Sequence, residues 1–289
     1  MINVRRGRPE DLETVTAFTA ETFTWGDYVS GAFAFWLDEP DADVLVAVND
    51  EDVVVAIVHV RQMSAQEGWL SGARVAPQHR RQGVGSVLNG AAVDWLRERG
   101  VLVARLTTEE DNDAAKSQVE RLGYHQAARF IYGRREFVRH GAGANGGKRL
   151  PSAEQFDLAP SAEAEPAFVV FQSGELARAG HGLYAPEGWD FRRLHHADLV
   201  KAARHRQLWT SPSGWAVTTQ NESELWIGLF VTTAEDARAA VRALVDLGAE
   251  NRVEVIEMMV PRVPWLEEAL VAEHIELGHS NVVYELPIG

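Results

Sequence analysis

Residues 75–86 read Val75-Ala76-Pro77-Gln78-His79-Arg80-Arg81-Gln82-Gly83-Val84-Gly85-Ser86, and this stretch decides the fold. It lies between a segment typical of a β-strand and a longer segment typical of a helix. Pro77 ends the strand, and the two glycines permit backbone angles and close approaches that other residues block. The first N–H groups of a helix have no partner inside it, and the helix dipole adds positive potential there. The stretch therefore predicts an anion site suited to a pyrophosphate.

Two known phosphate-binding patterns fit this stretch poorly. A dinucleotide-binding fingerprint needs a third glycine where this chain has Leu88, and the strands before the loop have an antiparallel pattern. A P-loop needs Gly-Lys-Ser/Thr after its spacer residues, which this sequence lacks. An ordinary strand–helix turn with glycines for geometry stays open as an alternative, because short glycine motifs are common.

Length and composition limit the classes of protein. The chain has 289 residues, of which 46% are apolar and 24% charged, so we expect a globular protein of two domains. A formal net charge of -14 disfavours nucleic acid or an anionic membrane as a partner. The absence of cysteine excludes disulfides, thiolate metal sites and a cysteine nucleophile. Without a signal-peptide pattern or a long apolar run, the expected location is the cytoplasm.

The first half of the chain alternates strands and helices. Apolar spacing and β-branched runs indicate their places. The expected elements are a helix at 11–23, strands at 44–48, 53–60 and 69–75, a helix at 85–98, a strand at 101–107, a helix at 113–121 and a strand at 128–137.

The second half repeats this order of elements, which suggests an internal duplication. Its expected elements are strands at 207–210, 215–218 and 224–231, a helix at 234–247, a strand at 252–259, a helix at 265–274 and a strand at 281–286. Between the halves lies a glycine-, proline- and acid-rich stretch without apolar period. We therefore expect domains at 1–140 and 167–289 joined by a linker at 141–166. The expected fold class is α/β (α+β), with a mixed, mostly antiparallel sheet flanked by helices in each domain.

Two motifs in the first half resemble those of the GNAT (GCN5-related) N-acetyltransferase superfamily. Arg80-x-x-Gly83-x-Gly85 after Val75-Ala76-Pro77 is similar to the family's acyl-CoA pyrophosphate loop. Asn112-Asp113-Ala114-Ala115, followed by Leu122-Gly123-Tyr124, is similar to its Asn-x-x-Ala…Leu-Gly-Phe segment. The resemblance covers about residues 2 to 137. As a two-domain chain, the protein also resembles the tandem members, including the mycothiol synthase-like ones, which implies two GNAT-like domains.

The resemblance implies acetyl-CoA as co-substrate, without a metal. The strands at 69–75 and 101–107 would part, and the pantetheine arm would pair like an added strand with the backbone of Ala73, Arg74 and Val75. A backbone N–H there would polarise the thioester carbonyl. Arg80 or Arg81 would add charge at the pyrophosphate. The main-chain N–H groups around the pyrophosphate would be those of Arg81, Gln82, Gly83, Val84, Gly85 and Ser86.

Asn112 has two roles open to it. It would hydrogen-bond the pantetheine arm, as the resemblance implies, or cap the following helix, and both roles can hold together.

The usual catalytic residues of the family are missing. The position seven residues after Asn112, where many members have a tyrosine as acid, is Val119, and a frequent glutamate position is Thr107. The candidates that remain are Glu109 or Glu110 as general base, directly or through water, and Tyr124 as general acid. The alternatives are a solvated strand end for the two glutamates and core packing for Tyr124.

An aromatic-rich segment at 23–36 lies where the resemblance places the wall of the acceptor pocket. Its candidate acceptor-binding residues are Trp25, Tyr28 and Trp36. The alternative is a pair of short helices that pack on the sheet. Nearby acidic residues suit a cationic amine, either a small molecule or a peptide.

The second half lacks the anion loop. Residues 230–236 contain no glycine and no arginine, and Glu235 and Asp236 occupy the place where an anion needs donors. We therefore expect this half not to bind CoA, and instead to shape the acceptor cleft or to carry a homodimer contact. It could also supply a strand that the first half lacks, from 168–171 or 281–286. No metal site is expected at His195, His196 and His205 of this half, because adjacent histidines point in different directions and no carboxylate stands four residues after His195 or His196.

Together these features predict a cytoplasmic N-acetyltransferase that moves an acetyl group from acetyl-CoA to a primary amine directly in a ternary complex. Without cysteine no thioester intermediate forms on the enzyme. Two alternatives stay open: a protein that binds acyl-CoA and transfers nothing, and a pure interaction protein.

Overall fold

The computed structural model describes residues 2–20, 22, 26–137 and 155–289, and the chain forms two compact units. Unit 1 comprises Met1–Leu106, Lys116–His125 and Tyr284–Gly289, and unit 2 comprises Thr107–Ala115 and Gln126–Val283. Each unit therefore combines segments from both halves of the chain.

The sheet of unit 1 has the strand order β1-β2-β3-β4-β5-β14. Consecutive pairs from β1 to β4 are antiparallel, whereas β4 and β5 are parallel. Parallel strands need a crossover, and the helix between them provides it. The strands are β1 (Asn3–Arg6), β2 (Ala42–Val48), β3 (Val54–Gln62), β4 (Glu67–Val75), β5 (Val103–Glu109) and β14 (Glu276–Pro287).

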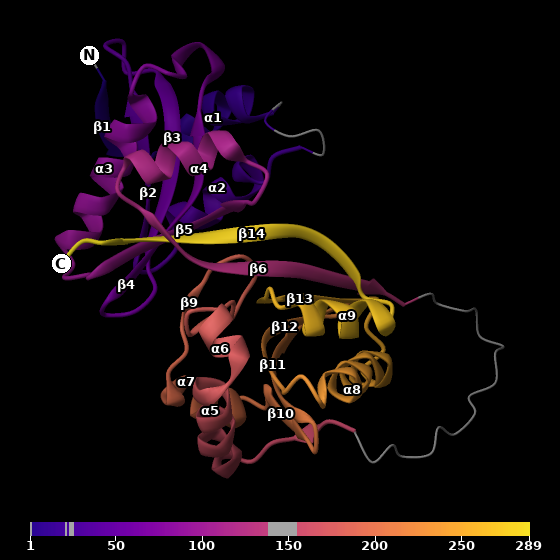
Figure 1. The fold of residues 1–289 in the computed structure, drawn as a ribbon. Helices are drawn as coiled ribbons and strands as arrows, with labels where there is room; N and C mark the ends of the chain where they lie inside the picture. Colours follow the sequence, from indigo (N-terminus) through magenta and orange to yellow (C-terminus); the bar gives the residue numbers. More distant parts are fainter. Residues whose placement is uncertain (1, 21, 23–25, 138–154) are drawn as a thin grey trace. The chain divides into compact units, whose positions relative to one another are not determined.

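Helices cover both faces of this sheet, which explains why β2 and β3 are apolar almost throughout (Figure 1). Val44, Val46 and Ile57 pack with α1 and α2, and α3 contacts the same two strands on their other face. The helices are α1 (Leu12–Thr19), α2 (Val29–Leu37), α3 (Val84–Arg97) and α4 (Asp113–Arg121), with short 3-10 turns at Pro9–Asp11 and Pro77–His79.

The end of the chain supplies a strand to unit 1. Strand β14 is the neighbour of β5 in the sheet, and Ile288 N–H donates to Leu102 O over 2.9 Å. The buried Arg105 pairs with Glu67 and, at 3.1 Å, with Glu285 of β14. The prediction that the strand missing from the first half comes from 281–286 is therefore confirmed.

The sheet of unit 2 has the order β14-β6-β13-β12-β11-β10-β7. Strands β12 and β13 are parallel, as β4 and β5 are in unit 1, and the pairs β6–β13, β11–β12, β10–β11 and β7–β10 are antiparallel. The strands are β6 (His125–Glu136), β7 (Asp157–Leu158), β10 (Leu208–Ser211), β11 (Gly214–Gln220), β12 (Glu224–Val231) and β13 (Val255–Pro261).

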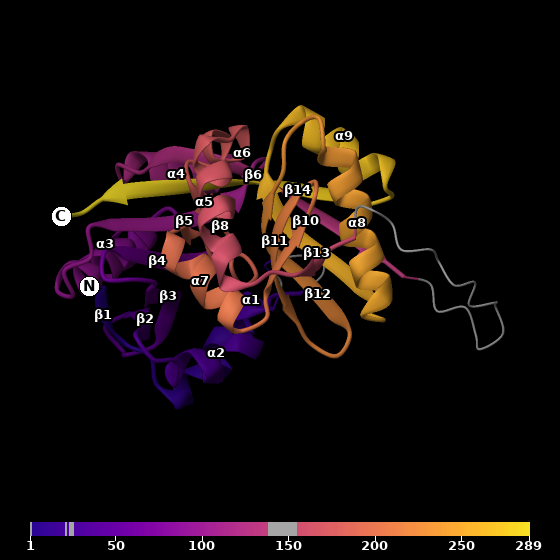
Figure 2. The same cartoon turned by 90° about the horizontal axis from the view of Figure 1, so that it is seen from below.

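Helices lie on both faces of this sheet (Figure 2), and an apolar cluster packs on each face. Alternating residues of β11 divide between them: Ala216 packs with α8 and α9, and Val217 packs with α5 and α7. The helices are α5 (Ala164–Ser173), α6 (Glu175–Ala179), α7 (His196–Arg204), α8 (Ala237–Glu250) and α9 (Pro264–Ala272), with a 3-10 turn at Ser161–Glu163 and a small separate sheet of β8 (Leu183–Tyr184) and β9 (Arg192–Arg193).

The structure confirms the fold class and the repeated order of strands and helices. The division into units differs from the expected domains at 1–140 and 167–289, because β6 pairs with β13 from Phe130 to Glu136 and so lies in unit 2. Of the expected linker at 141–166, residues up to 154 lie outside the described residues, and the rest contains β7, a 3-10 turn and the start of α5.

Two further differences concern single elements. The alternative that placed a strand at 168–171 is wrong, because this segment lies in α5, where Ala164, Ala167 and Phe171 are buried at helical spacing. Strand β1 was not among the elements expected from the sequence, and α2 was expected only in the alternative of a pair of short helices at 23–36. Within the described part of the chain, no helix is long and apolar enough to cross a membrane.

Candidate cofactor site

The loop before α3 presents a row of backbone donors. Gly83 precedes the helix in the left-handed region, with φ +81°, and Arg81 is also left-handed, with φ +60°. Among the described residues, the N–H groups of residues 81–85 have no acceptor, whereas the N–H of Ser86 donates to Gly83 O over 3.0 Å. Consecutive free amides at a helix N-terminus form the concave donor set that binds phosphate.

Two of the three arginines at this loop remain available to an anion. Arg80 Nε donates to Val75 O over 3.0 Å, which anchors its stem, while Arg81 is exposed. Arg74 instead forms an ion pair with Asp27, a carboxylate that is 1% exposed, over 2.6 Å. The charge of Arg74 is therefore neutralised locally. Of its possible roles in cofactor binding, only the predicted backbone pairing with the pantetheine arm remains.

Strand β4 has an open edge beside this loop. It pairs with β5 only from Glu67 to Trp69, and the later residues of β4 pair with β3 alone. At Gly72 the strand carries a β-bulge with φ +62°, since one residue of β3 lies opposite two of β4 there. The parting of the strands that the resemblance implied is thus present, and it leaves backbone groups from residue 70 on for an added strand.

Gln118 and Asn89 are residues near the loop that sequence reasoning missed. A Cβ built at Gly85 would lie 2.7 Å from Gln118 Nε2, so this amide of α4 lies directly against the start of α3. Asn89 Nδ2 donates to the hydroxyl of Tyr124 over 3.3 Å. These contacts, of Gln118 with the start of α3 and of Asn89 with Tyr124, depend on how the elements pack in three dimensions, which a short sequence motif does not show.

The sequence model of the Acetyltransferase (GNAT) family matches residues 12–124 of this chain. This segment belongs to the GNAT family. N-alpha-acetyltransferase 30 of Schizosaccharomyces pombe is 30% identical over 82 residues, which are 27% of this chain and 55% of that protein. Probable N-acetyltransferase 16 of Homo sapiens is 32% identical over 103 residues, 35% of this chain and 28% of that protein. The chain thus spans about half or less of the curated relatives it matches.

Solved structures extend the GNAT likeness to the full chain. A GCN5-related N-acetyltransferase from Sphaerobacter thermophilus aligns with a TM-score of 0.64 at 13% identity, over 99% of this chain and 96% of that one. A tandem GNAT protein from the clavulanic acid biosynthesis pathway aligns with a TM-score of 0.55 at 16% identity, over 100% and 99%. At these identities the likeness concerns the fold, and it confirms the predicted tandem GNAT-like architecture.

The predicted acid of the GNAT domain is a buried side chain. Tyr124 is 3% exposed, and burial raises the pKa of its hydroxyl to about 12. The hydroxyl is therefore protonated at neutral pH and able to donate. The packing alternative also has support, because the ring lies in the core of unit 1.

The predicted base candidates and Asn112 belong to unit 2. Glu110 is engaged by Arg262 at 2.5 Å and by Arg129 at 3.5 Å, so its carboxylate oxygens already have partners. Glu109 is half-buried. Asn112 Oδ1 accepts the N–H of Ala115 over 3.1 Å, so the capping role of Asn112 is observed.

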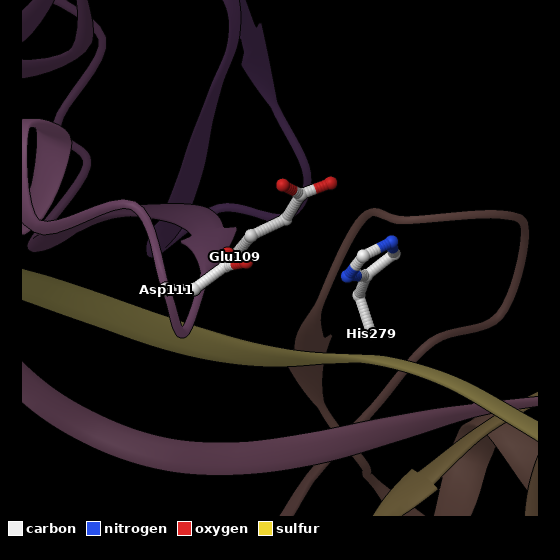
Figure 3. Close-up of side chains that lie close together, drawn as sticks. All are labelled: Glu109, Asp111 and His279. Carbon is white, nitrogen blue, oxygen red and sulfur yellow. The ribbon is translucent and has the colours of Figure 1, made fainter.

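Glu109 also takes part in a small cluster of groups that could hold a metal ion (Figure 3). Ligand-type atoms of Glu109, Asp111 and His279 lie within 4.8 Å of one another. Exposed carboxylates gather in this way without an ion as well. The sequence could not indicate this set, because the histidine comes from β14, far along the chain. The histidines near α7 have other contacts: His196 faces Glu165 at 3.2 Å, and His205 contacts the backbone of Lys201.

The predicted acceptor residues have different environments. Tyr28 is 46% exposed, lies edge-on to Trp36 and carries the Arg74 guanidinium over its ring. Trp36 is only 7% exposed and packs in the core beneath α2, as the alternative of a packed helix expected. Trp25 lies outside the described residues.

In unit 2 the corresponding strand–helix connection is stabilised by its own side chains. Thr233 Oγ1 donates to Asp236 Oδ2 over 2.8 Å and accepts the N–H of Asp236. The acidic side chain thus lies at the positive end of α8. That this half does not bind CoA stays a prediction.

Proposed function

We propose that this protein is an acetyl-CoA-dependent N-acetyltransferase that transfers the acetyl group directly to a primary amine. The single observation that carries this proposal is the row of free amides at residues 81–85 at the head of α3. It occurs inside a segment of the GNAT family, beside a strand whose edge is open.

The cofactor would be held by backbone and charge. The amides of residues 81–85 would surround the pyrophosphate, without that of Ser86, which donates to Gly83 O. Arg80 and Arg81 would add charge-assisted hydrogen bonds of about 1.5–3 kcal/mol each. The pantetheine arm would lie along Ala73, Arg74 and Val75. Binding energy from this tail would place the thioester for attack.

The chemistry would combine proximity with proton transfer. A backbone N–H of β4 would polarise the thioester carbonyl, and Tyr124 would protonate the departing thiolate. Of the two predicted bases, Glu109 is the better candidate, because Glu110 is held by two arginines. The acceptor class is a small-molecule or peptide amine, and neither a metal, nucleic acid nor a membrane has a part. A homodimer contact through unit 2 remains part of the proposal.

Calorimetric titration with acetyl-CoA and a thiol-release assay over a defined amine set test this function. The set contains spermidine, tyramine, an aminoglycoside and short peptides with free N-termini or lysine. We expect binding, with thiol release for at least one class. Gln82→Glu places a carboxylate at the predicted anion site and should weaken binding, whereas Gln66→Glu, equally exposed and outside the loop, should not. Binding without release for every amine would leave only an acyl-CoA-binding protein.

A further inference from the structure

A chain of three polar side chains, with the buried His59 at its centre, lies on the α1/α2 face of unit 1. His59 of β3 is opposite Ser71 of β4 in the antiparallel register, and its Nδ1 lies 3.0 Å from Ser71 Oγ. On the other side of the ring, Nε2 lies 2.9 Å from Glu39 Oε2. Trp36 stacks on the imidazole at 4.6 Å, with the ring planes 5° apart. The imidazole is thus fixed on two edges and one face.

The contacts decide where the proton of the neutral imidazole lies. The Glu39 carboxylate, 2.9 Å from Nε2, favours the neutral ring with its proton on Nε2, although this contact lacks hydrogen-bond geometry. Nδ1 then offers its lone pair to the hydroxyl proton of Ser71. Burial is the main reason why the pKa of His59 is lowered to about 4, since the effect of Glu39 opposes that of burial and Arg61 adds to it. The ring is therefore neutral at physiological pH and would hold an added proton only transiently, during acyl transfer.

The position of Ser71 gives this chain an outlet. His59 is 2% exposed, whereas Ser71 is half-buried and is the member of the pair that solvent reaches. Ser71 directly precedes the bulge at Gly72, on the part of β4 that has lost its β5 partner. It also shares the face of Tyr28 and α2, where the acceptor amine is expected.

We propose that Ser71, His59 and Glu39 form a proton relay that takes the proton from the amine during acyl transfer. The proposal rests on the proposed function and assigns a base within unit 1, in place of Glu109. The substrate is a primary amine that attacks in its neutral form, and the relay removes the proton that its nitrogen must lose after the attack.

The step balances as follows in atoms and electrons. The nitrogen lone pair forms the C–N bond, and the carbonyl π electrons move to oxygen. The nitrogen then loses its extra proton to Ser71 Oγ while the Ser71 proton passes to His59 Nδ1, and Glu39 stabilises the imidazolium. The tetrahedral intermediate collapses, the C–S bond breaks with its electron pair on sulfur, and Tyr124 protonates the thiolate. The imidazolium, with its low pKa, returns a proton to water, and Tyr124 regains one from water.

Kinetics of Ser71→Ala, Ser71→Thr and Glu109→Gln test the relay, with acetyl-CoA and the amine of the defined set that gives most thiol release. Ser71→Ala should lower kcat about 100-fold, the usual effect of losing general base catalysis, with an unchanged KM for acetyl-CoA. Ser71→Thr keeps a hydroxyl and should restore most of kcat. Ser117→Ala, also exposed to solvent, is the matched control. A solvent isotope effect on kcat should fall in Ser71→Ala, which a structural role would not produce.

The outcomes separate the relay from the enzyme function. If Ser71→Ala retains wild-type kcat, or if only Glu109→Gln lowers it, the relay is wrong while the acetyltransferase stands. If no amine releases thiol although acetyl-CoA binds, the proposed function fails and the relay fails with it. Should Ser71→Ala unfold, which a melting curve shows, His59→Gln decides in its place, because glutamine can bond both Ser71 and Glu39 but cannot act as a base. A kcat for His59→Gln equal to wild type would then overturn the proposal.

Discussion

Removal of the two loop arginines gives the sharpest test of the anion site. In Arg80→Ala/Arg81→Ala the free amides of residues 81–85 stay in place, and two guanidinium groups beside them are lost. A charge-assisted hydrogen bond contributes about 1.5–3 kcal/mol, and both arginines are exposed, so the lower value applies to each. Every 1.4 kcal/mol is tenfold in affinity, so Kd for acetyl-CoA should rise about 100-fold in the double variant.

The assay is calorimetric titration with acetyl-CoA at two salt concentrations, beside a matched control. In Arg178→Ala/Arg204→Ala, two other exposed arginines are lost, one of which also donates to a backbone carbonyl. Both pairs change the net charge equally. The loop variant should lose affinity and much of its salt dependence, and the control should keep both. Equal affinities for the two double variants would refute a phosphate role for this loop.

Three predictions concern stability and can be checked by urea unfolding. The folded pKa of His59, about 4, lies below its ordinary 6.5, so the unfolded state takes up the proton first as pH falls. The free energy of unfolding should therefore decrease by about 3 kcal/mol between pH 6.5 and pH 4. In His59→Gln this part of the pH dependence should vanish. Gly72→Ala should lower the free energy of unfolding by about 2 kcal/mol or more, because φ is +62° and the new Cβ would lie 2.6 Å from Trp36. The control Gly31→Ala, inside α2 with open space around it, should raise it by about 0.5–1 kcal/mol. Stability changes of the same sign in the two variants would contradict the strained bulge. Arg105→Met removes the buried guanidinium that pairs with Glu67 and Glu285 and should cost about 3–5 kcal/mol, and a loss under 1 kcal/mol would show these ion pairs to be dispensable.

Local patterns carried the sequence predictions that the structure confirms. Helix α4 and strand β12 have the expected bounds, because each has a clear period and clear end signals. The loop at 75–86 was recognisable because its glycines and arginines are neighbours in sequence. Helix α2 was expected only within an alternative, because residues 29–37 are apolar almost throughout and the segment has hardly any polar face to reveal its period.

Contacts between distant residues account for what the sequence could not show. Glu39, His59 and Ser71 meet only because the β3–β4 register aligns two of them and the end of α2 brings the third. The pairing of Arg74 with Asp27, which neutralises a charge beside the loop, likewise joins residues far apart in the sequence. No short motif encodes such pairings, since each depends on strand register and on a bulge at one glycine.

The protein has a net negative charge and its proposed cofactor is a polyanion, so the loop must attract an anion within an acidic chain. A chain with a formal charge of -14 repels a polyanion at long range, but backbone amides and a helix dipole give local positive potential without changing that count. The acidic remainder would still attract a cationic amine. This arrangement separates the two substrates by electrostatics: CoA would depend on short-range hydrogen bonds at α3, and the amine on the field of the whole chain. Added salt should therefore weaken amine capture through its association rate more than it weakens cofactor binding through the amides.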